Sequence, residues 1–194
     1  MKQYQFKNNQ EYVEAQISAN VAKIDRNWVH EAELGIIANF IILEFGRPEF
    51  VICHGARNGF EVETLGKYFG RDLTIIGTDI SPTANKIPDM LQWDFHEINP
   101  KWAGLADLVY CNSLDHSYDM RKAVTAWMDS LKPRGIIVVH WTEGHEKGDV
   151  KPSDCFHASD REYEKILSKC GTVLCKNRIE ILKGGYYFVV MKKS

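Results

Sequence analysis

Short continuous apolar runs alternate with amphipathic stretches through the middle of the chain. The apolar runs occupy residues 50–53, 73–78, 90–93, 106–111 and 136–139. Helical spacing of apolar residues separates them, most clearly over 60–69 and 120–131. Strands that are apolar along their whole length are typical of a parallel sheet covered by helices on both faces. The pattern therefore predicts an α/β fold with a mostly parallel sheet.

The two ends of the chain follow other patterns. Apolar spacings of three and four around Trp28 predict a helical N-terminal extension that stops near Gly46. Near the other end, a helix at 160–169 precedes two β-like runs at 173–182 and 186–191. Gly184 and Gly185 join these runs, as in a hairpin. We therefore expect a three-layer sandwich with a seven-stranded, mostly parallel sheet and an antiparallel C-terminal strand.

Length and composition are those of one globular domain. The 194 residues are 44% hydrophobic and 26% charged, which are ordinary values. We expect a helical extension at 1–46, a ligand-binding core at 47–141, and a loop, helix and hairpin on the substrate side at 142–194. The net charge of −2 gives no drive toward nucleic acid or an anionic membrane.

Neither end nor interior carries a membrane or export signal. No window reaches the ~18 uninterrupted apolar residues of a transmembrane helix, and the polar N-terminus lacks the apolar core of a signal peptide. The five cysteines are an odd number with irregular spacing, so we expect reduced thiols rather than a disulfide framework. These features predict a cytoplasmic protein.

A possible nucleoside site follows the first two apolar runs. Gly55 and Gly59 lie in a turn between the first run and a helix, where glycine lets a ligand approach the main chain and helix N–H groups face it. Asp79 ends the second run, where a carboxylate can accept hydrogen bonds from ribose hydroxyls. Alternatively, Asp79 caps the turn before Ser81.

The turn discriminates among nucleoside cofactors. NAD, FAD and S-adenosylmethionine all remain candidates on the strand–turn–helix–strand–acid pattern alone. Dinucleotide folds use G-x-G-x-x-G, whose glycines accommodate pyrophosphate. Here Arg57 takes the place of the middle glycine between Gly55 and Gly59, which disfavours a dinucleotide.

Several motifs occur in the order found in one family. They are the glycine turn at 55–59, Asp79, the stretch Gln-Trp-Asp-Phe at 92–95, Leu-Asp-His-Ser-Tyr-Asp at 114–119 and Leu-Lys-Pro-Arg-Gly-Ile at 131–136. In these motifs the chain resembles the class I S-adenosylmethionine-dependent methyltransferases of the small-molecule type, over roughly residues 48–141. The resemblance implies the Rossmann-like fold, S-adenosylmethionine as cofactor and methyl transfer as the activity.

The resemblance also implies positions for the cofactor contacts. Gly55, Ala56 and Gly59 would line the methionine and ribose side, Asp79 would take the ribose hydroxyls, Ile80 would pack on the adenine, Asp94 and Phe95 would meet the adenine amino group, and Asn112 would face the sulfonium. Two positions depart from the family. Cys53 stands where an acid usually holds the ligand's amino group, and Arg57 replaces the middle glycine. His54 or Asn112 could take over the task of that acid.

His116 is the candidate general base. It follows the run at 106–111, at the carboxyl edge of the sheet where ligands bind in open α/β folds. An imidazole can accept a proton from a hydroxyl nucleophile, while alignment of the acceptor is the protein's other task. The alternative is a histidine that braces its loop through a backbone hydrogen bond.

Two further groups of residues have plainer explanations. Acidic and histidine residues crowd the segment after the apolar run at 136–139, namely His140, Glu143, His145, Glu146, Asp149, Asp154 and His157. Their spacing matches no recognised ligand pattern, so we expect a polar substrate loop and no metal site. Trp28 and His30 could belong to a lid, but their spacing favours a helix packed on the sheet.

The sequence thus predicts methyl transfer to a small-molecule or glycan-like acceptor, on oxygen or nitrogen. A non-catalytic S-adenosylmethionine-binding or regulatory protein is one alternative, because of Cys53 and Arg57. An NAD-dependent oxidoreductase is the other.

Overall fold

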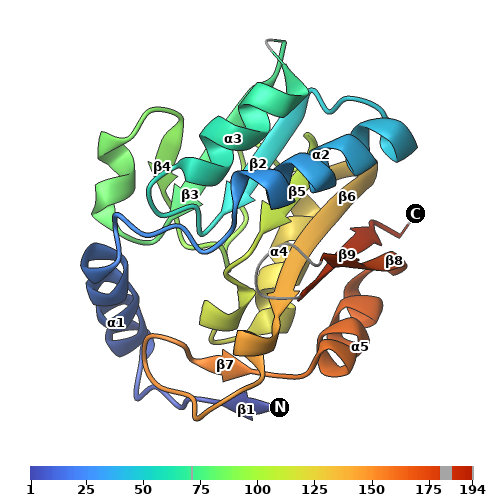
Figure 1. Cartoon of the computed structure of the whole chain (residues 1–194). Helices are drawn as coiled ribbons and strands as arrows, with labels where there is room; N and C mark the ends of the chain where they lie inside the picture. Colours follow the sequence, from blue (N-terminus) through green and yellow to red (C-terminus); the bar gives the residue numbers. More distant parts are fainter. Residues whose placement is uncertain (71, 180–184, 194) are drawn as a thin grey trace.

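A computed structural model describes residues 1–70, 72–179 and 185–193. The elements in chain order are β1 (Lys2–Gln3), α1 (Asn9–Ala22), α2 (Glu31–Phe45), β2 (Phe50–His54), α3 (Phe60–Phe69), β3 (Thr74–Asp79), β4 (Met90–Gln92), β5 (Ala106–Cys111), α4 (Met120–Ser130), β6 (Leu131–Thr142), β7 (Phe156–His157), α5 (Asp160–Cys170), β8 (Thr172–Ile179) and β9 (Gly185–Met191). Short 3₁₀ turns lie at Pro82–Lys86, Leu114–His116 and Glu143–His145. Figure 1 shows this arrangement.

The predicted sheet is confirmed. Seven strands are ordered β4-β3-β2-β5-β6-β9-β8, and all neighbours are parallel except β9, which is antiparallel to both β6 and β8. The chain order reverses between β2 and β5, and ligands of open α/β sheets bind outside the carboxyl ends of the strands at such a point. The predicted hairpin pairing of the last two strands is present, but Gly184 in its turn lies outside the described residues.

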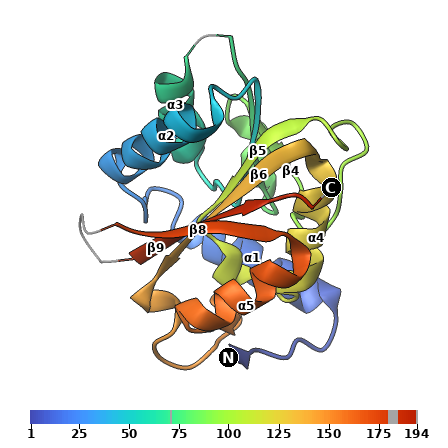
Figure 2. The same ribbon diagram turned by 90° about the vertical axis from the view of Figure 1, so that its right-hand side faces the viewer.

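Both faces of the sheet are covered, as the apolar residues 50–53 of β2 lead one to expect. Ile52 faces a core cluster that includes Trp127 of α4 and Leu167 of α5. Cys53, next along the strand, faces the opposite cluster, which includes Leu34 of α2 and residues of α3. Figure 2 shows α2 and α3 on one side of the sheet and α4 and α5 on the other. The three-layer prediction is therefore confirmed.

The predicted helical extension consists of two helices with different positions. α2 packs against α3, whereas α1 lies at the carboxyl edge of the central strands (Figure 1). Asn8 caps α1 by accepting a hydrogen bond from the backbone N–H of Glu11 (2.9 Å). Trp28 precedes α2 and is 46% exposed, so its expected place on a helix face was wrong. Within the described residues no helix is both long and apolar enough to cross a membrane.

The sequence pattern did not indicate the ribbon formed by β1 and β7. The two strands are antiparallel, with Lys2 opposite His157 and Gln3 opposite Phe156. Each strand has two residues, too short for an alternation of apolar and polar positions to be detected. The ribbon joins the N-terminal segment to the loop that follows β6, so both lie on the same side of the sheet edge.

Candidate functional site

A cleft lies at the carboxyl ends of β2, β3 and β5, beneath α1. Its lining residues are Tyr12, Gln16, Ala19, Asn20, Lys23, Gly55, Arg57, Asp79, Ile80, Asp94, Phe95, Ser113 and His116. Of the ten sequence-predicted site residues, six belong to this lining: Gly55, Asp79, Ile80, Asp94, Phe95 and His116. The sequence reasoning did not identify the α1 residues, because nothing in the chain shows where an amphipathic helix will dock.

Gly55 is the closest point of the turn to the opposite strand. Its φ is +68°, and a Cβ at this position would lie 2.7 Å from Oγ of Ser113. Ser113 Oγ donates a hydrogen bond to the Gly55 carbonyl (3.1 Å). Both the backbone torsion and the close approach therefore require glycine.

Asp79 is fixed by the glycine turn and by its own loop. Its Oδ2 accepts a hydrogen bond from the backbone N–H of Arg57 (3.1 Å), and its Oδ1 accepts one from the backbone N–H of Ser81 (3.0 Å). Burial raises the pKa of Asp79, while these backbone N–H groups act in the opposite direction. The contact with Ser81 agrees with the alternative that Asp79 caps this turn, and its place in the cleft leaves a ligand role open.

Helix α1 closes over this part of the cleft. Asn20 of α1 is buried, and its Oδ1 accepts a hydrogen bond from Oγ1 of Thr83 (3.1 Å), four residues beyond Asp79. A second link runs from the guanidinium of Arg57 to the carbonyl of Arg26, between α1 and α2 (2.9 Å). Arg57 thus directs its side chain toward the covering segment, and the N-terminal region contributes a cover through α1 rather than through Trp28.

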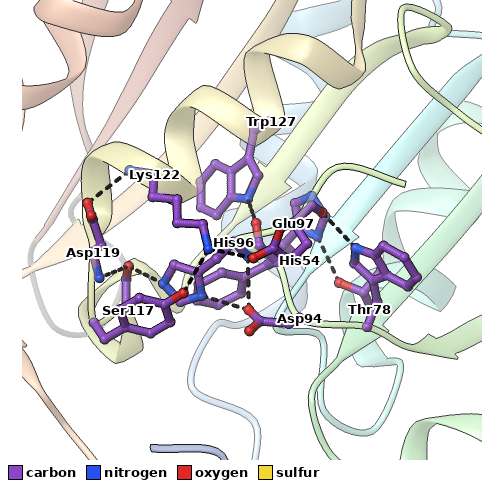
Figure 3. A network of polar contacts seen from close by, with 12 residues as sticks. His54, Thr78, Asp94, His96, Glu97, Ser117, Asp119, Lys122 and Trp127 are labelled. Atoms are coloured by element: carbon purple, nitrogen blue, oxygen red, sulfur yellow. Dashed lines mark hydrogen bonds and ion pairs between the residues drawn. The ribbon is translucent and has the colours of Figure 1, made fainter. Parts of the chain in front are cut away.

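Asp94 is oriented by a histidine that the sequence reasoning missed. Its Oδ1 accepts hydrogen bonds from the backbone N–H of His96 (3.0 Å) and from Nδ1 of the same residue (2.7 Å). Nε2 of His96 lies 2.7 Å from Oγ of Ser117 (Figure 3). The imidazole ring also stacks on Tyr118. Partial burial opposes ionisation of Asp94, but the contacts with His96 outweigh it and lower the pKa of Asp94. The Asp-x-His spacing was the available signal.

Four predicted cofactor residues lie outside the lining of the cleft. His54 is buried, shares a hydrogen bond with Oγ1 of Thr78 (2.8 Å) and stacks on Trp127. Burial lowers the pKa of His54 to about 3, so the ring is neutral. Ala56 and Gly59 hold the backbone of the turn. The N–H of Ala56 donates a hydrogen bond to the carbonyl of Thr78, and Gly59 caps the start of α3 with a φ of +80°. The fourth, Asn112, lines the adjacent pocket.

His116 lies between the cleft and a second pocket of about 590 Å³. Its Nδ1 is 3.1 Å from Oε1 of Gln16 on α1. Its Nε2 lies 3.8 Å from Oδ2 of Asp115 and 3.8 Å from Oδ1 of Asp154, both beyond hydrogen-bond distance. Nδ1 of His116 therefore contacts Gln16 of α1 and does not brace the turn that carries His116.

The polar loop after β6 forms the far wall of this pocket. His145, Asp154 and His157 line it together with Asp115. Other charged residues of the loop are paired at the surface instead, as Glu143 is with Lys147.

Comparisons with known proteins rest on structure alone. No family model matches the chain, and no curated protein sequence matches it. A methyltransferase of Burkholderia thailandensis, the 1,6-didemethyltoxoflavin-N1-methyltransferase solved with its substrate and S-adenosylhomocysteine, superposes with a TM-score of 0.76 over 98% of this chain and 93% of its own, at 14% identity. The N-methyltransferase NodS of Bradyrhizobium japonicum WM9, with S-adenosylhomocysteine, gives 0.68 over 93% and 100%, at 13% identity.

The protein has the class I methyltransferase fold. A third solved structure agrees with this assignment: a putative methyltransferase of Haloferax volcanii in complex with the Trm112 methyltransferase activator, with a TM-score of 0.66 over 97% of this chain and 100% of the other, at 16% identity.

Within the class I fold, the departure at Cys53 has a buried acid beside it. Glu61, in the first turn of α3, accepts a hydrogen bond at Oε1 from Nδ2 of Asn112 (3.0 Å). Burial raises the pKa of Glu61 to about 7, and the nearby Arg57 acts against this shift. The carboxyl also lies near enough to Cys53 to raise the pKa of its thiol, after burial as the main cause. The sequence reasoning missed Glu61, whose signal was an acid two residues after Gly59.

Proposed function

We propose that the protein binds S-adenosylmethionine and transfers its methyl group to a small-molecule or glycan-like acceptor, on oxygen or nitrogen. The observation that carries this proposal is the contact between the Gly55–Gly59 turn and Asp79 at the point where the strand order reverses, in a fold whose solved examples bind S-adenosylhomocysteine. The cofactor itself would supply an electrophilic methyl group on its sulfonium.

The residues that line the cleft suit a nucleoside, but α1 leaves an open volume of only about 50 Å³ there, so α1 must move before a nucleoside can enter. Gly55 lines the cleft, and only glycine fits there because the Cβ of any other residue would meet Ser113. Each carboxylate oxygen of Asp79 accepts one backbone N–H and keeps further lone-pair capacity for ribose hydroxyls. Ile80 and Phe95 provide apolar surface for the adenine, and Asp94 is ordered toward the same cleft by His96.

Glu61 would not contact the cofactor itself but would orient Asn112, which would. Its hydrogen bond orients Asn112, which in turn lines the pocket beside the cleft. A buried acid in this position supports the proposal that Asn112 faces the methionine end of the cofactor, where Cys53 provides no charge. His54 does not take over that task in this arrangement, because its ring is engaged by Thr78 and Trp127.

His116 is the proposed proton acceptor for a hydroxyl nucleophile. Since an amide oxygen only accepts hydrogen bonds, its contact with Gln16 Oε1 places the imidazole proton on Nδ1. Nε2 then carries the lone pair and faces the pocket where an acceptor can enter. Nearby Asp115 and Asp154 would stabilise the positive charge that protonation creates.

Calorimetry with S-adenosylhomocysteine tests the proposal. We expect saturable binding that Asp79→Ala abolishes and that Asp129→Ala, an exposed acid on α4, leaves unchanged. Thermal unfolding of both variants checks that the fold is retained. Absence of binding to the folded wild-type protein would overturn the proposal, and NADH binding in its place would favour an oxidoreductase. Binding without methyl transfer to any hydroxylated or amino acceptor would favour the regulatory alternative.

A further inference from the structure

Three ligand-type side chains converge beside the proposed methyl-transfer site. Asp115 and His116 lie on the turn after β5, and Asp154 lies on the loop after β6. One atom from each of the three lies within 4.8 Å of the other two. Ligands bound at about 2.1 Å to a tetrahedral ion lie about 3.4 Å apart, so the two 3.8 Å separations from His116 Nε2 need only a small contraction.

The protonation of His116 favours a cation in the gap. Its Nδ1 carries the proton toward Gln16, which directs the unprotonated Nε2 toward two carboxylate oxygens. A lone pair that faces two carboxylates is stabilised by a positive charge between them, which a metal ion bound to all three groups would supply. A ligating histidine commonly donates its other N–H to an oxygen acceptor in this way, which fixes the ring.

Unpartnered buried atoms provide an independent sign of a missing ligand. Asp115 is 9% exposed, and its Oδ1 has no hydrogen-bond partner within the described residues. This oxygen lies 3.8 Å from Nε2 of His145, whose Nδ1 is also buried and without a hydrogen bond in that part of the chain. Buried polar atoms are nearly always satisfied, so such a group beside a ligand-type cluster indicates an ion.

Two lysine ammonium groups lie beside Asp154, so a bound cation would share this carboxylate with one of them and displace the other. Lys151 pairs with Oδ2 of Asp154 (2.9 Å), on the oxygen that faces away from His116. Lys23 lies 3.8 Å from the other oxygen, Oδ1, and its flexible side chain can retract when an ion binds there. His157 also lines the pocket, and its buried Nδ1 has no hydrogen-bond partner among the residues that the structure describes.

We propose that Asp115, His116 and Asp154 bind a divalent transition-metal ion. Mixed imidazole and carboxylate sets suit Zn²⁺, Mn²⁺ and Fe²⁺ rather than Ca²⁺. The ion would border the 590 Å³ pocket, where the oxygen atoms of an acceptor can reach it. Such an acceptor would carry a hydroxyl beside a second oxygen donor. In the loaded protein His116 is a ligand, and the ion takes over the polarisation of the acceptor hydroxyl.

The metal role of this site rests on its own geometry, and only the acceptor role rests on the proposed methyl transfer. Protein stripped with a chelator is titrated with Zn²⁺ and with Co²⁺, and bound metal is measured by elemental analysis after gel filtration. We expect one equivalent per chain and visible Co²⁺ absorption. Asp154→Asn and Asp115→Asn each lower the affinity for Zn²⁺ by at least about tenfold.

Asp149→Asn is the matched control, because Asp149 lines the same pocket but is 96% exposed and paired with Lys2. This variant binds Zn²⁺ as the wild type does. If the wild type holds no ion, or if Asp115→Asn and Asp154→Asn bind it as tightly as Asp149→Asn, the proposal is wrong. Thermal unfolding of Asp115→Asn and Asp154→Asn shows that any loss of metal is not unfolding. Zn²⁺ binding without S-adenosylhomocysteine binding would sink the proposed function and leave the metal site standing.

Discussion

Nδ2 of Asn112 donates a hydrogen bond to Oε1 of Glu61, at 3.0 Å, and so joins the end of β5 to the first turn of α3. The carboxyl group is buried, and burial raises its pKa from an ordinary 4.5 to about 7. It lies beside Cys53, at the position where the class I pattern has an acid. The carboxyl group that the strand lacks is thus present nearby, on α3, and it is protonated below about pH 7.

Glu61→Gln should change the pH dependence of stability. The folded state keeps its proton to about pH 7, whereas the unfolded chain loses it near pH 4.5, so the free energy of unfolding falls between these values as pH rises. The full shift corresponds to about 3 kcal/mol as an upper limit. Glutamine keeps the acceptor for Asn112 and does not titrate.

Denaturant unfolding of both proteins at pH 4.5, 6 and 8 checks this. We expect the free energy of unfolding of Glu61→Gln to rise relative to that of the wild type as pH rises, with little difference near pH 4.5. A difference that stays constant over this range would mean that the carboxyl group is not held in its neutral form.

Gly55→Ala should damage the cleft more than an ordinary loss of glycine does. A side chain at φ +68° costs about 1–2 kcal/mol, and the new Cβ would meet Oγ and Cβ of Ser113 at 2.7 and 2.8 Å. Gly46→Ala is the control, since its φ is +85° and nothing lies within 4 Å. We expect only Gly55→Ala to lower the affinity for S-adenosylhomocysteine, at least about tenfold, measured by calorimetry.

A second variant separates strain from collision. Adding Ser113→Gly to Gly55→Ala removes both atoms that the new Cβ meets, so part of the affinity should return. Ser113→Ala should not rescue it, because the Cβ of the residue remains. Equal losses for Gly46→Ala and Gly55→Ala would contradict the close-approach explanation.

Thr83→Val should loosen α1 over the cleft. It removes the hydroxyl that donates to Asn20, a contact of about 1 kcal/mol, or about fivefold in an equilibrium constant. We expect S-adenosylhomocysteine to dissociate several-fold faster in stopped-flow fluorescence, and α1 to be cleaved faster by protease. Thr74→Val, at the exposed start of β3, is the control. Unchanged dissociation would indicate that α1 does not act as a cover.

His96→Leu should destabilise the protein by about 2–3 kcal/mol. It removes the side-chain partner of Asp94 and leaves Ser117 without its contact to Nε2, in a buried network where unpaired groups are costly. Ser117→Ala removes one of these contacts and should cost about 1 kcal/mol. Thermal unfolding of the two variants measures both losses in the free energy of unfolding. Equal losses would show that the contact between His96 and Asp94 does not stabilise the protein.

The sheet could be predicted because its information is local. The runs at 50–53 and 136–139 are apolar at every position, the other three contain a few polar residues such as Asp107 and Gln92, and such runs are typical of buried parallel strands. The glycine turn and the acid after the next strand could likewise be placed, because parallel strands bring their carboxyl ends to one edge. For this reason Gly55 and Asp79, 24 positions apart, lie in one cleft.

The residues that were misplaced or missed depend on side-chain direction and on docking. His54 was placed with the ligand because it follows the strand, yet it is the last residue of β2 and faces Trp127. Strand alternation decides which face a residue takes, and the sequence does not show where a strand ends. Glu61 and His96 were missed because each acts through a partner from another element.

The sequence by itself determined the layer order, the strand directions and the edge of the sheet at which chemistry can occur, because periodicity and turn residues act within a few positions. Tertiary structure alone decided that α1 covers this edge and that Asp115, His116 and Asp154 converge. These contacts join the turn after β5 to the loop after β6 and to α1, segments separated by tens of residues. No local pattern encodes them, since they are selected only when the packed elements bring the three segments together.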